Sequence, residues 1–339
     1  MRRSPGRLPK PGRRSSKSLF PDERTEGPVQ ISVAVVGAGA MGCLFAARMA
    51  EAGARVTVID VDPLRLDAIR SQGIMLTDDA GTRAVRVEAA LAQHFPGPVD
   101  LLLLFTKGMH SAAAIASVAH LRSHGSVALT LQNGIGNAEQ LAAVFGADRV
   151  LMGTALIPAD LTNPCAVETH GFASLQLGAF AGADIGTVDR IADLLERSGF
   201  EVHRHSDILH AVWQKLAFNA SLNAIGMICA VPNAGLDNPA GRRIAIAVVD
   251  ETIAVATSQG LTLDRDHILT NIDAALREHG GHKASMLQDR EAGRPSEIET
   301  INGAIAAEGK RAGVATPVCD TLADLVRIVE AAAAKRASA

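Results

Sequence analysis

The stretch Ile31-Ser-Val-Ala-Val-Val36, followed at once by Gly37-Ala-Gly39-Ala-Met-Gly42, decides the fold of the first part of this chain. The six residues before the glycines are mostly β-branched or small and apolar, and they predict a buried strand. The segment from Cys43 to Glu51 predicts a helix, and Arg55-Val-Thr-Val-Ile-Asp60 predicts a second strand. A strand, a Gly-x-Gly-x-x-Gly turn, a helix and a strand together make a dinucleotide-binding βαβ unit.

Each glycine of this turn has its own role in such a unit. Gly37 permits the tight turn, Gly39 lets the backbone approach a pyrophosphate, and Gly42 lets the helix pack on the strand. The N-terminus of the helix then faces the phosphates. We therefore expect the cofactor to contact Gly37, Ala38, Gly39, Ala40, Met41 and Gly42. A glycine-rich turn that binds nothing is the alternative interpretation.

Asp60 bears on the choice between the two nicotinamide cofactors. It ends the second strand, about twenty residues past the glycines, where a carboxylate accepts hydrogen bonds from the ribose hydroxyls of adenosine and repels a 2′-phosphate. Asp60 therefore favours NADH over NADPH. Two alternatives stay open: Asp60 only forms the turn ahead of Asp62-Pro63, or Arg65 or Arg70 turns toward a phosphate.

Two further predicted strands end on polar residues. The strand over 99–105 is followed by Thr106-Lys107, and the strand over 127–132 by Asn133-Gly134. Ligands of open α/β sheets lie outside the carboxyl ends of the strands. We therefore expect Lys107 and Asn133 where cofactor and substrate meet, although Asn133-Gly134 is also an ordinary turn sequence.

The composition excludes several classes of protein. Hydrophobic residues make up 47% of the 339 residues and charged residues 20%, which is typical of a folded globular chain. No tyrosine is present, so a mechanism that needs a tyrosine acid is excluded. Aromatic residues make up only 3%, too few for a surface that stacks nucleic-acid bases. No apolar stretch reaches the roughly 18 residues of a membrane span.

The cysteines and histidines offer no metal site. The four cysteines are far apart and form no Cys-x-x-Cys pair, which fits a reducing compartment and an expected cytoplasmic location. His120 and His124 have the spacing of a zinc-binding pair, but Leu121 stands where His-Glu-x-x-His has its glutamate. We interpret this pair as the solvated end of a helix and expect no metal.

The first 30 residues differ from the rest of the chain. Residues 1–26 contain eight basic and three acidic side chains, together with several prolines and serines. This composition predicts a disordered basic extension. A transit peptide is the alternative, but the prolines would interrupt an amphipathic helix and acidic residues are present. The remainder of the chain is mildly acidic, so we expect no nucleic-acid partner.

From about Ile208 the pattern becomes helical, and we expect an all-α domain over residues 207–334 after an α/β domain over residues 31–206. Lys215, Asn219 and Asn223 follow one another at four-residue intervals and share one face of its first helix. Almost all their neighbours are apolar. Buried polar groups need partners, because an unsatisfied group costs about 1–3 kcal/mol. A polar ligand would supply them; a partly exposed helix face is the alternative.

A second polar segment runs from Ser285 to Gly303. Within it, Ser296 and Glu299 have the Ser-x-x-Glu spacing of a capping box, which predicts that a helix begins here. Glu297 would then lie in the first turn, where its charge complements the helix dipole. The start of this helix would also direct Glu297 across any cleft that it faces.

These motifs together resemble those of the ketopantoate reductases. The resemblance rests on the glycine turn, Lys107, Asn133-Gly134, Trp213-Gln-Lys215-Leu-x-x-Asn219-x-x-x-Asn223, and Ser285-Met-Leu-Gln-Asp289 leading to Ser296-Glu297-Ile298. It covers nearly the whole chain after residue 30. It implies a Rossmann domain followed by a helical domain akin to that of 6-phosphogluconate dehydrogenase, with the active site in the cleft between them.

The resemblance also implies roles for individual residues. Lys215 would be the catalytic acid and Glu297 the carboxylate that binds and orients the substrate. Lys107 would lie near the cofactor. The implied substrate contacts are Asn133, Asn219, Asn223 and Ser285.

Two positions depart from the family's pattern. Members usually carry a basic residue near the end of the second strand to hold the NADP phosphate, where this chain has Asp60-Val61. Many have a proline after the residue that matches Asn223, where this chain has Ala224. The first departure puts NADPH dependence in doubt, and the two together leave the keto acid open.

Three functions are compatible with these observations. One is NAD(P)H-dependent reduction of ketopantoate to pantoate; the second is a related NAD-dependent D-2-hydroxyacid dehydrogenase acting on another small-molecule 2-keto acid. The third is a non-catalytic regulator that senses NAD(P), which would need neither Lys215 nor Glu297. The sequence leaves open whether the chain forms a homodimer.

Overall fold

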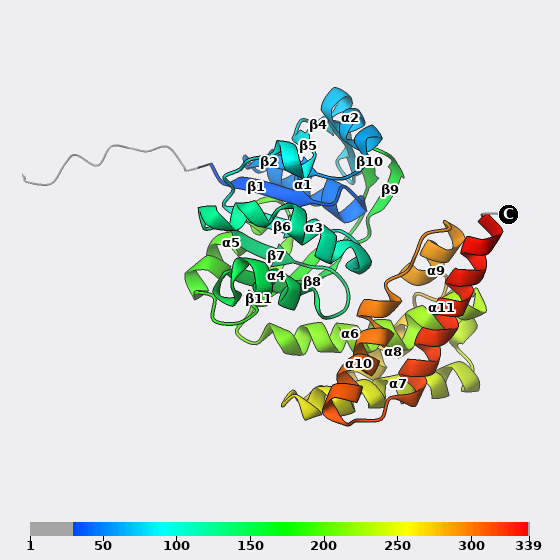
Figure 1. The fold of residues 1–339 in the computed structure, drawn as a ribbon. Coiled ribbons are helices and arrows are strands. Elements are labelled where there is room, and N and C mark those ends of the chain that lie inside the picture. Colours follow the sequence, from blue (N-terminus) through cyan, green and yellow to red (C-terminus); the bar gives the residue numbers. More distant parts are fainter. Residues whose placement is uncertain (1–29, 338–339) are drawn as a thin grey trace, which may run out of the picture. The chain divides into compact units, whose positions relative to one another are not determined.

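A computed structural model describes residues 30–337, with Ala337 described by its backbone alone. The predicted basic extension over residues 1–30 lies outside the described residues except for Gln30. The described part begins with an α/β domain and continues into a helical domain (Figure 1). The predicted fold class, a Rossmann-like domain followed by an all-α domain, is confirmed. The last strand of the first domain ends at His205 and the next helix begins at Ile208.

A sheet of eight strands is the centre of the first domain (Figure 1). Its order is β12-β11-β8-β7-β6-β1-β2-β5, and all neighbouring strands are parallel except β8 and β11. The strands are β1 (Ser32–Val36), β2 (Arg55–Ile59), β5 (Glu88–Ala90), β6 (Leu101–Leu104), β7 (Val127–Thr130), β8 (Val150–Leu156), β11 (Ser174–Ala179) and β12 (Glu201–His205).

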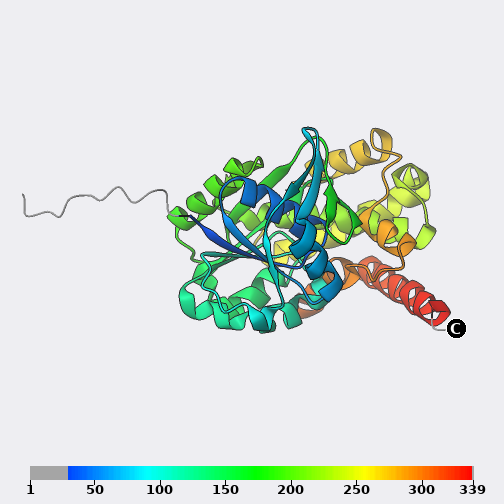
Figure 2. The same cartoon turned by 90° about the horizontal axis from the view of Figure 1, so that it is seen from above.

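Helices cover both faces of this sheet, as Figure 2 shows. They are α1 (Ala40–Glu51), α2 (Pro63–Gln72), α3 (Ser111–Ser117), α4 (Asn137–Phe145) and α5 (Ile185–Arg197). The strand β6 shows why helices must cover both faces of the sheet. Leu101 and Leu103 pack in one core with α1 and α5, while Leu102 and Leu104 pack in another with α3 and α4. A strand that is apolar at every position must be covered on both sides.

A smaller sheet of four strands, in the order β4-β3-β10-β9, was not predicted from the sequence. Its strands are β3 (Ile74–Asp78), β4 (Gly81–Val85), β9 (Asp160–Asn163) and β10 (Ala166–Glu168). The pairing of β3 with β10 joins segments about ninety residues apart. The strands are short and half-exposed, so their apolar pattern is weak.

The helical domain consists of six α-helices and two short 3-10 turns among the described residues. They are α6 (Ile208–Cys229), η5 (Asn233–Leu236), α7 (Pro239–Ser258), α8 (Arg265–Arg277), α9 (Ser285–Glu291), η6 (Ile298–Thr300), α10 (Asn302–Ala312) and α11 (Pro317–Ala337). Two of these helices begin at a proline: α7 at Pro239 and α11 at Pro317, where the missing N–H has no intrahelical acceptor to lose.

Helix α6 belongs to the cores of both domains. Ile208 and Val212, in its first turns, are buried among side chains of the sheet and of α3 and α4. From Trp213 onward its buried residues pack in the core of the helical domain. The polar side chains on α6 therefore lie where the two cores meet. No helix in the described part of the chain is both long enough and apolar enough to cross a membrane.

Candidate active site

The glycine turn of the βαβ unit forms a close-packed cradle. Gly37 has φ +100°, a conformation that side chains rarely adopt, and a Cβ on Gly42 would lie 1.8 Å from the Gly37 carbonyl oxygen. A Cβ on Gly39 would meet nothing within 4 Å, so the turn faces open space at that point. Helix α1 begins at Ala40, three residues before the predicted start at Cys43, because Gly39 is its extended N-cap.

This cradle fits the diphosphate of a dinucleotide. The N-terminus of α1 has no side-chain cap, and the first N–H groups of a helix have no acceptor within it. Such a terminus favours an anion. Two of the buried polar atoms without a hydrogen-bond partner in the described residues belong to side chains beside the turn, Thr106 Oγ1 and Arg65 Nε. Thr106 follows β6, and its backbone nitrogen packs against Gly37.

Asp60 is engaged with the backbone around the end of β2. Its carboxylate accepts hydrogen bonds from the N–H groups of Ala38 (2.6 Å), Val61 (2.8 Å) and Asp62 (2.9 Å). The guanidinium of Arg65 donates to the Ala38 carbonyl at 2.5 Å. Asp60 therefore holds the glycine turn and its own turn together, and Arg65 reaches the same end of the cradle. Arg70 instead bonds Ala89 and Asp67.

Lys215 lies in the third turn of α6, at the meeting of the two domains. Its ammonium donates to the carbonyl oxygen of Ala155, at the end of β8, over 2.7 Å. The residue as a whole is half-buried, but its ammonium is enclosed. Burial lowers the pKa of Lys215 to about 8, and the charge of Glu297 opposes this shift. The lysine thus loses its proton far more readily than a surface lysine does.

Glu297 directly precedes η6 in the helical domain and lies next to Asn133 of the first domain. The Asn133 amide donates to Glu297 Oε2 over 3.2 Å. Burial raises the pKa of the Glu297 carboxyl; the hydrogen bond from Asn133 and the charges of Lys107 and Lys215 oppose this shift, whereas Asp289 adds to it. Lys215, Asn133 and Glu297, which are far apart in the sequence, therefore form one cluster.

The other predicted substrate contacts lie farther along α6. Asn223 is buried and its amide donates to the hydroxyl of Ser285, the first residue of α9, over 3.2 Å. Asn219, between Lys215 and Asn223, is half-buried, and its side chain makes no hydrogen bond to another described residue. Its amide is therefore available to a polar ligand.

The predicted capping box around Glu297 is wrong. The Ser296 hydroxyl is buried without a hydrogen-bond partner in the part of the chain that the structure describes, and the Ser296 N–H donates instead to Glu330 on α11 (2.7 Å). Glu299 makes two hydrogen bonds of 2.7 Å to Arg327. These partners on α11 displace the local contacts of a capping box. Glu297 is the N-cap of the single turn η6, and α10 begins only at Asn302.

Lys107 does reach the site, but its contacts are with the helical domain. It forms an ion pair with Asp289 of α9, and its ammonium donates to the Pro295 carbonyl over 3.0 Å. Sequence reasoning did not single out Asp289 as a partner. It also missed Thr300, whose carbonyl accepts from the Ile135 N–H (3.0 Å) and which packs against Gly134. The signal in the sequence that could have indicated Asp289 and Thr300 is their position shortly after Ser285 and Glu297.

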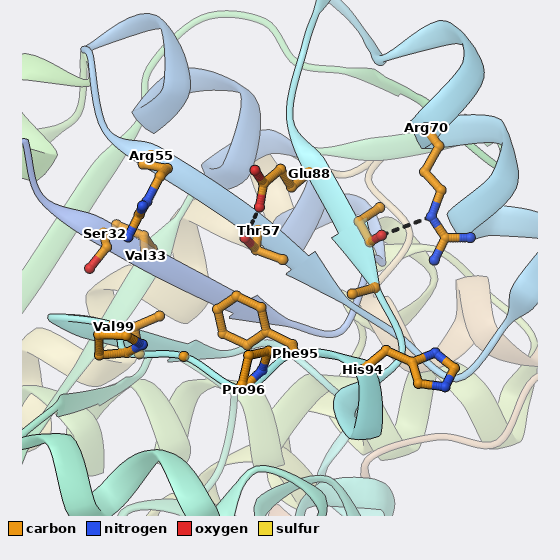
Figure 3. A pocket seen from close by; sticks show the side chains of 14 residues that line it. Ser32, Val33, Arg55, Thr57, Arg70, Glu88, His94, Phe95, Pro96 and Val99 are labelled. Carbon is orange, nitrogen blue, oxygen red and sulfur yellow. Dashed lines mark hydrogen bonds between the residues drawn. The ribbon is translucent and has the colours of Figure 1, made fainter.

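A cavity of about 530 Å³ lies at the opposite side of the sheet from the glycine turn, where the strands begin (Figure 3). Its walls include Ser32, Arg55 and Glu88, the first residues of β1, β2 and β5. The glycine turn and Lys107 follow the carboxyl ends of their strands, so this cavity is separate from the site. Among the described residues, no group of three or more His, Cys, Asp or Glu side chains is placed to hold a metal ion.

A dinucleotide cradle, joined through one helix to a domain that supplies a buried lysine and a carboxylate, defines a two-domain NAD(P)-dependent oxidoreductase that acts on CH–OH groups. Residues 33–182 match the family described as ketopantoate reductase PanE/ApbA, and residues 207–330 match the C-terminal domain of that family. The chain belongs to the ketopantoate reductase family.

Two relatives illustrate the sequence similarity. The 2-dehydropantoate 2-reductase of Halobacterium salinarum is 30% identical over 300 residues, which cover 88% of this chain and 98% of that protein. The enzyme of the same name from Lactococcus lactis subsp. lactis is 27% identical over 304 residues, covering 88% of this chain and 97% of that protein.

Solved structures agree with this assignment. The ternary structure of D-mandelate dehydrogenase with NADH and anilino(oxo)acetate superposes with a TM-score of 0.85 at 28% identity, covering 89% of this chain and 99% of that one. The 2-dehydropantoate 2-reductase of Geobacter metallireducens GS-15 superposes with a TM-score of 0.81 at 30% identity, covering 88% and 99%.

Proposed function

We propose that the enzyme reduces ketopantoate, a small 2-keto acid, to pantoate, with Lys215 as the general acid. The observation that carries this proposal is the enclosed Lys215 ammonium, with Glu297 and Asn133 clustered beside it at the meeting of the two domains. The names of the relatives from Halobacterium salinarum and Lactococcus lactis support the choice of substrate.

The residues divide the chemistry between them. The nicotinamide, when bound, supplies a hydride to the carbonyl carbon of the keto acid. Negative charge then develops on the carbonyl oxygen, and the Lys215 ammonium stabilises that charge and donates its proton to give the hydroxyl. With a pKa near 8, Lys215 is still mostly protonated at neutral pH and is also a stronger acid than an ordinary lysine.

Neighbouring groups would hold the substrate. Glu297 orients the substrate and helps to keep Lys215 charged, and Asn133 holds Glu297. Asn219, Asn223 and Ser285 offer neutral hydrogen bonds to the polar groups of the keto acid; the free amide of Asn219 supports this role. The residues from Gly37 to Gly42 would hold the cofactor, with Asp60 at its adenosine end and Asn133 toward the nicotinamide.

NADH is the proposed preferred cofactor. The carboxylate of Asp60 lies at the end of the cradle that receives the adenosine ribose, where its charge opposes a 2′-phosphate. Arg65 at the same end, whose Nε makes no hydrogen bond within the described residues and lies 3.8 Å from an Asp62 carboxylate oxygen, is what would favour NADPH. The four cysteines, which form no disulfide, support a cytoplasmic location.

A second candidate is an NAD-dependent D-2-hydroxyacid dehydrogenase that uses a different keto acid. The similarity to D-mandelate dehydrogenase, solved with NADH, favours it, as does Asp60. The same lysine and carboxylate would serve this reaction. The two candidates differ in which side chain of the keto acid the pocket accepts.

Turnover of a panel of keto acids tests both candidates. Ketopantoate, a branched aliphatic 2-keto acid and an aromatic 2-keto acid would each be assayed with NADH and with NADPH by following cofactor oxidation. We expect the highest kcat/KM for ketopantoate. A higher value for the aromatic acid with NADH would select the D-2-hydroxyacid dehydrogenase. No turnover with any pair would overturn the assignment as a 2-keto acid reductase.

A further inference from the structure

The segment over residues 292–297, which joins α9 to η6 and ends on Glu297, is held from both sides. Lys107, which follows β6 in the first domain, donates to the carbonyl of Pro295, two residues before Glu297. The same ammonium pairs with Asp289 on α9. A single side chain of the Rossmann domain therefore contacts both the segment that carries Glu297 and the helix that precedes it.

Asp289 is the buried centre of these contacts. Its side chain is only 8% exposed, so its charge needs close partners. One carboxylate oxygen faces Lys107, and the other faces Arg294 Nε at 3.2 Å. The backbone N–H of Arg294 also donates to the Asp289 carbonyl over 2.8 Å, which folds the segment back on α9. Without Lys107, this folded segment would lose its ion pair to the Rossmann domain.

The charged groups that face Glu297 are Lys107, Lys215 and Asp289. Lys107 and Asp289 act on it in opposite directions: the charge of Lys107 lowers the pKa of Glu297 and the charge of Asp289 raises it. Asn133 adds a hydrogen bond from the same domain as Lys107. The position and the ionisation of Glu297 thus both depend on Lys107 and Asp289.

We propose that Lys107 and Asp289 are positioning residues, whose ion pair fixes the Glu297 segment against the Rossmann domain and so places the carboxylate that orients the substrate. This inference rests on the proposed function, in which Glu297 contacts the keto acid. It differs from the expectation that Lys107 serves the cofactor, because the ammonium of Lys107 is directed at Asp289 and Pro295.

A double-mutant cycle tests the pair. Lys107→Met, Asp289→Asn and the double variant would be compared with the wild type in kcat and KM for ketopantoate and in KM for the cofactor. We expect each single change to lower kcat/KM for the keto acid about tenfold, and the double change to do no more than the worse single one. Cofactor KM should stay within about twofold. Losses that multiply in the double variant would overturn the proposal.

The pH profile separates positioning from general damage to the fold. Protonation of Glu297 sets the acid limb of kcat/KM. Asp289→Asn should move that limb to lower pH, and Lys107→Met should move it to higher pH. Shifts in the same direction, or none, would contradict the proposal. Glu291→Gln is the matched control, since Glu291 lies on the same helix but pairs with the exposed Lys283, and its profile should equal that of the wild type.

A further measurement does not depend on turnover. Amide hydrogen exchange over residues 292–297 should be faster in Lys107→Met and Asp289→Asn, by similar factors, and unchanged in Glu291→Gln. Lys107→Arg keeps the charge and should restore most of the protection. Unchanged exchange in both single variants would overturn the positioning role. If the wild type reduced no keto acid while the variants still showed this exchange pattern, the proposed function alone would be rejected and the positioning role would stand.

Discussion

The cofactor cradle and the Lys215 cluster are two polar sites at the same edge of one sheet, built in different ways. The cradle comes from a single stretch of chain. Its parts are fixed by backbone sterics and by hydrogen bonds such as the one that the Ala38 N–H donates to the Asp60 carboxylate. The Lys215 cluster draws on α6, the turn after β7 and the segment before η6. In this cluster, burial lowers the pKa of Lys215 and raises the pKa of Glu297.

This contrast indicates how the work is divided. A local motif can bind a common cofactor through backbone groups and a helix N-terminus. Chemistry requires charged groups that are partly removed from water, and those come from segments that only the folded chain brings together. Substitutions in one site at a time can therefore check that binding belongs to the cradle and chemistry to the cluster.

The largest effect is expected for Lys215→Ala. The change removes the ammonium that stabilises and protonates the carbonyl oxygen in the proposed mechanism, so kcat should fall by a hundredfold or more, within the 10²–10⁴ range of general acid catalysis. Cofactor affinity, measured by fluorescence titration, should change little because the Lys215 ammonium bonds the Ala155 carbonyl and not the glycine turn. A variant with more than about a third of the wild-type kcat would rule out the general-acid role.

Glu297→Gln should have the next largest effect, a fall of about tenfold or more in kcat together with a higher KM for the keto acid. The free energy of unfolding should not fall. Because burial raises the pKa of Glu297 in the folded state, its charge above that pKa destabilises the fold, and glutamine removes it. Thermal unfolding at neutral pH would check this. Unchanged kinetics with a lower melting temperature would indicate a purely structural residue.

The cradle and its βαβ unit were predicted from the sequence almost residue by residue, because all their parts are local. The face shared by Lys215, Asn219 and Asn223 was predicted as well, from helical spacing. Their partners were not: nothing in the sequence connects Lys215 to Ala155, or Asp289 to Lys107. Glu299 shows the opposite failure, since a local motif predicted a cap and a distant arginine, Arg327, took the carboxylate.

Asp60→Ala tests the cradle and should change cofactor preference by roughly tenfold. In the wild type, repulsion between Asp60 and one phosphate charge is about 3 kcal/mol at ~5 Å and an effective dielectric of ~20, and Arg65 offsets part of it. We expect NADH to give the higher kcat/KM, and the variant to bind NADH less tightly and NADPH more tightly. A wild-type preference of tenfold for NADPH, about 1.4 kcal/mol the other way, would mean that Arg65 reads the phosphate.

A further effect concerns pH. In the proposed mechanism the reduction needs protonated Lys215, so kcat/KM for the keto acid should decline as pH rises through about 8, where Lys215 loses its proton. The reverse oxidation needs the neutral amine and should increase over the same interval. Rate profiles in both directions, from pH 6 to 10, would check the sign. Profiles that stay level through this interval in both directions would contradict the assignment.

The position of Trp213 gives the protein a built-in optical probe. It is the only tryptophan of a chain without tyrosine, it is 3% exposed, and it lies on α6 two residues before Lys215. All indole emission therefore arises from one place, the helix that the two cores share. Reduced nicotinamide absorbs in the range where tryptophan emits, so energy transfer from Trp213 would report cofactor binding, and a shift of its emission would report rearrangement of α6, without any label.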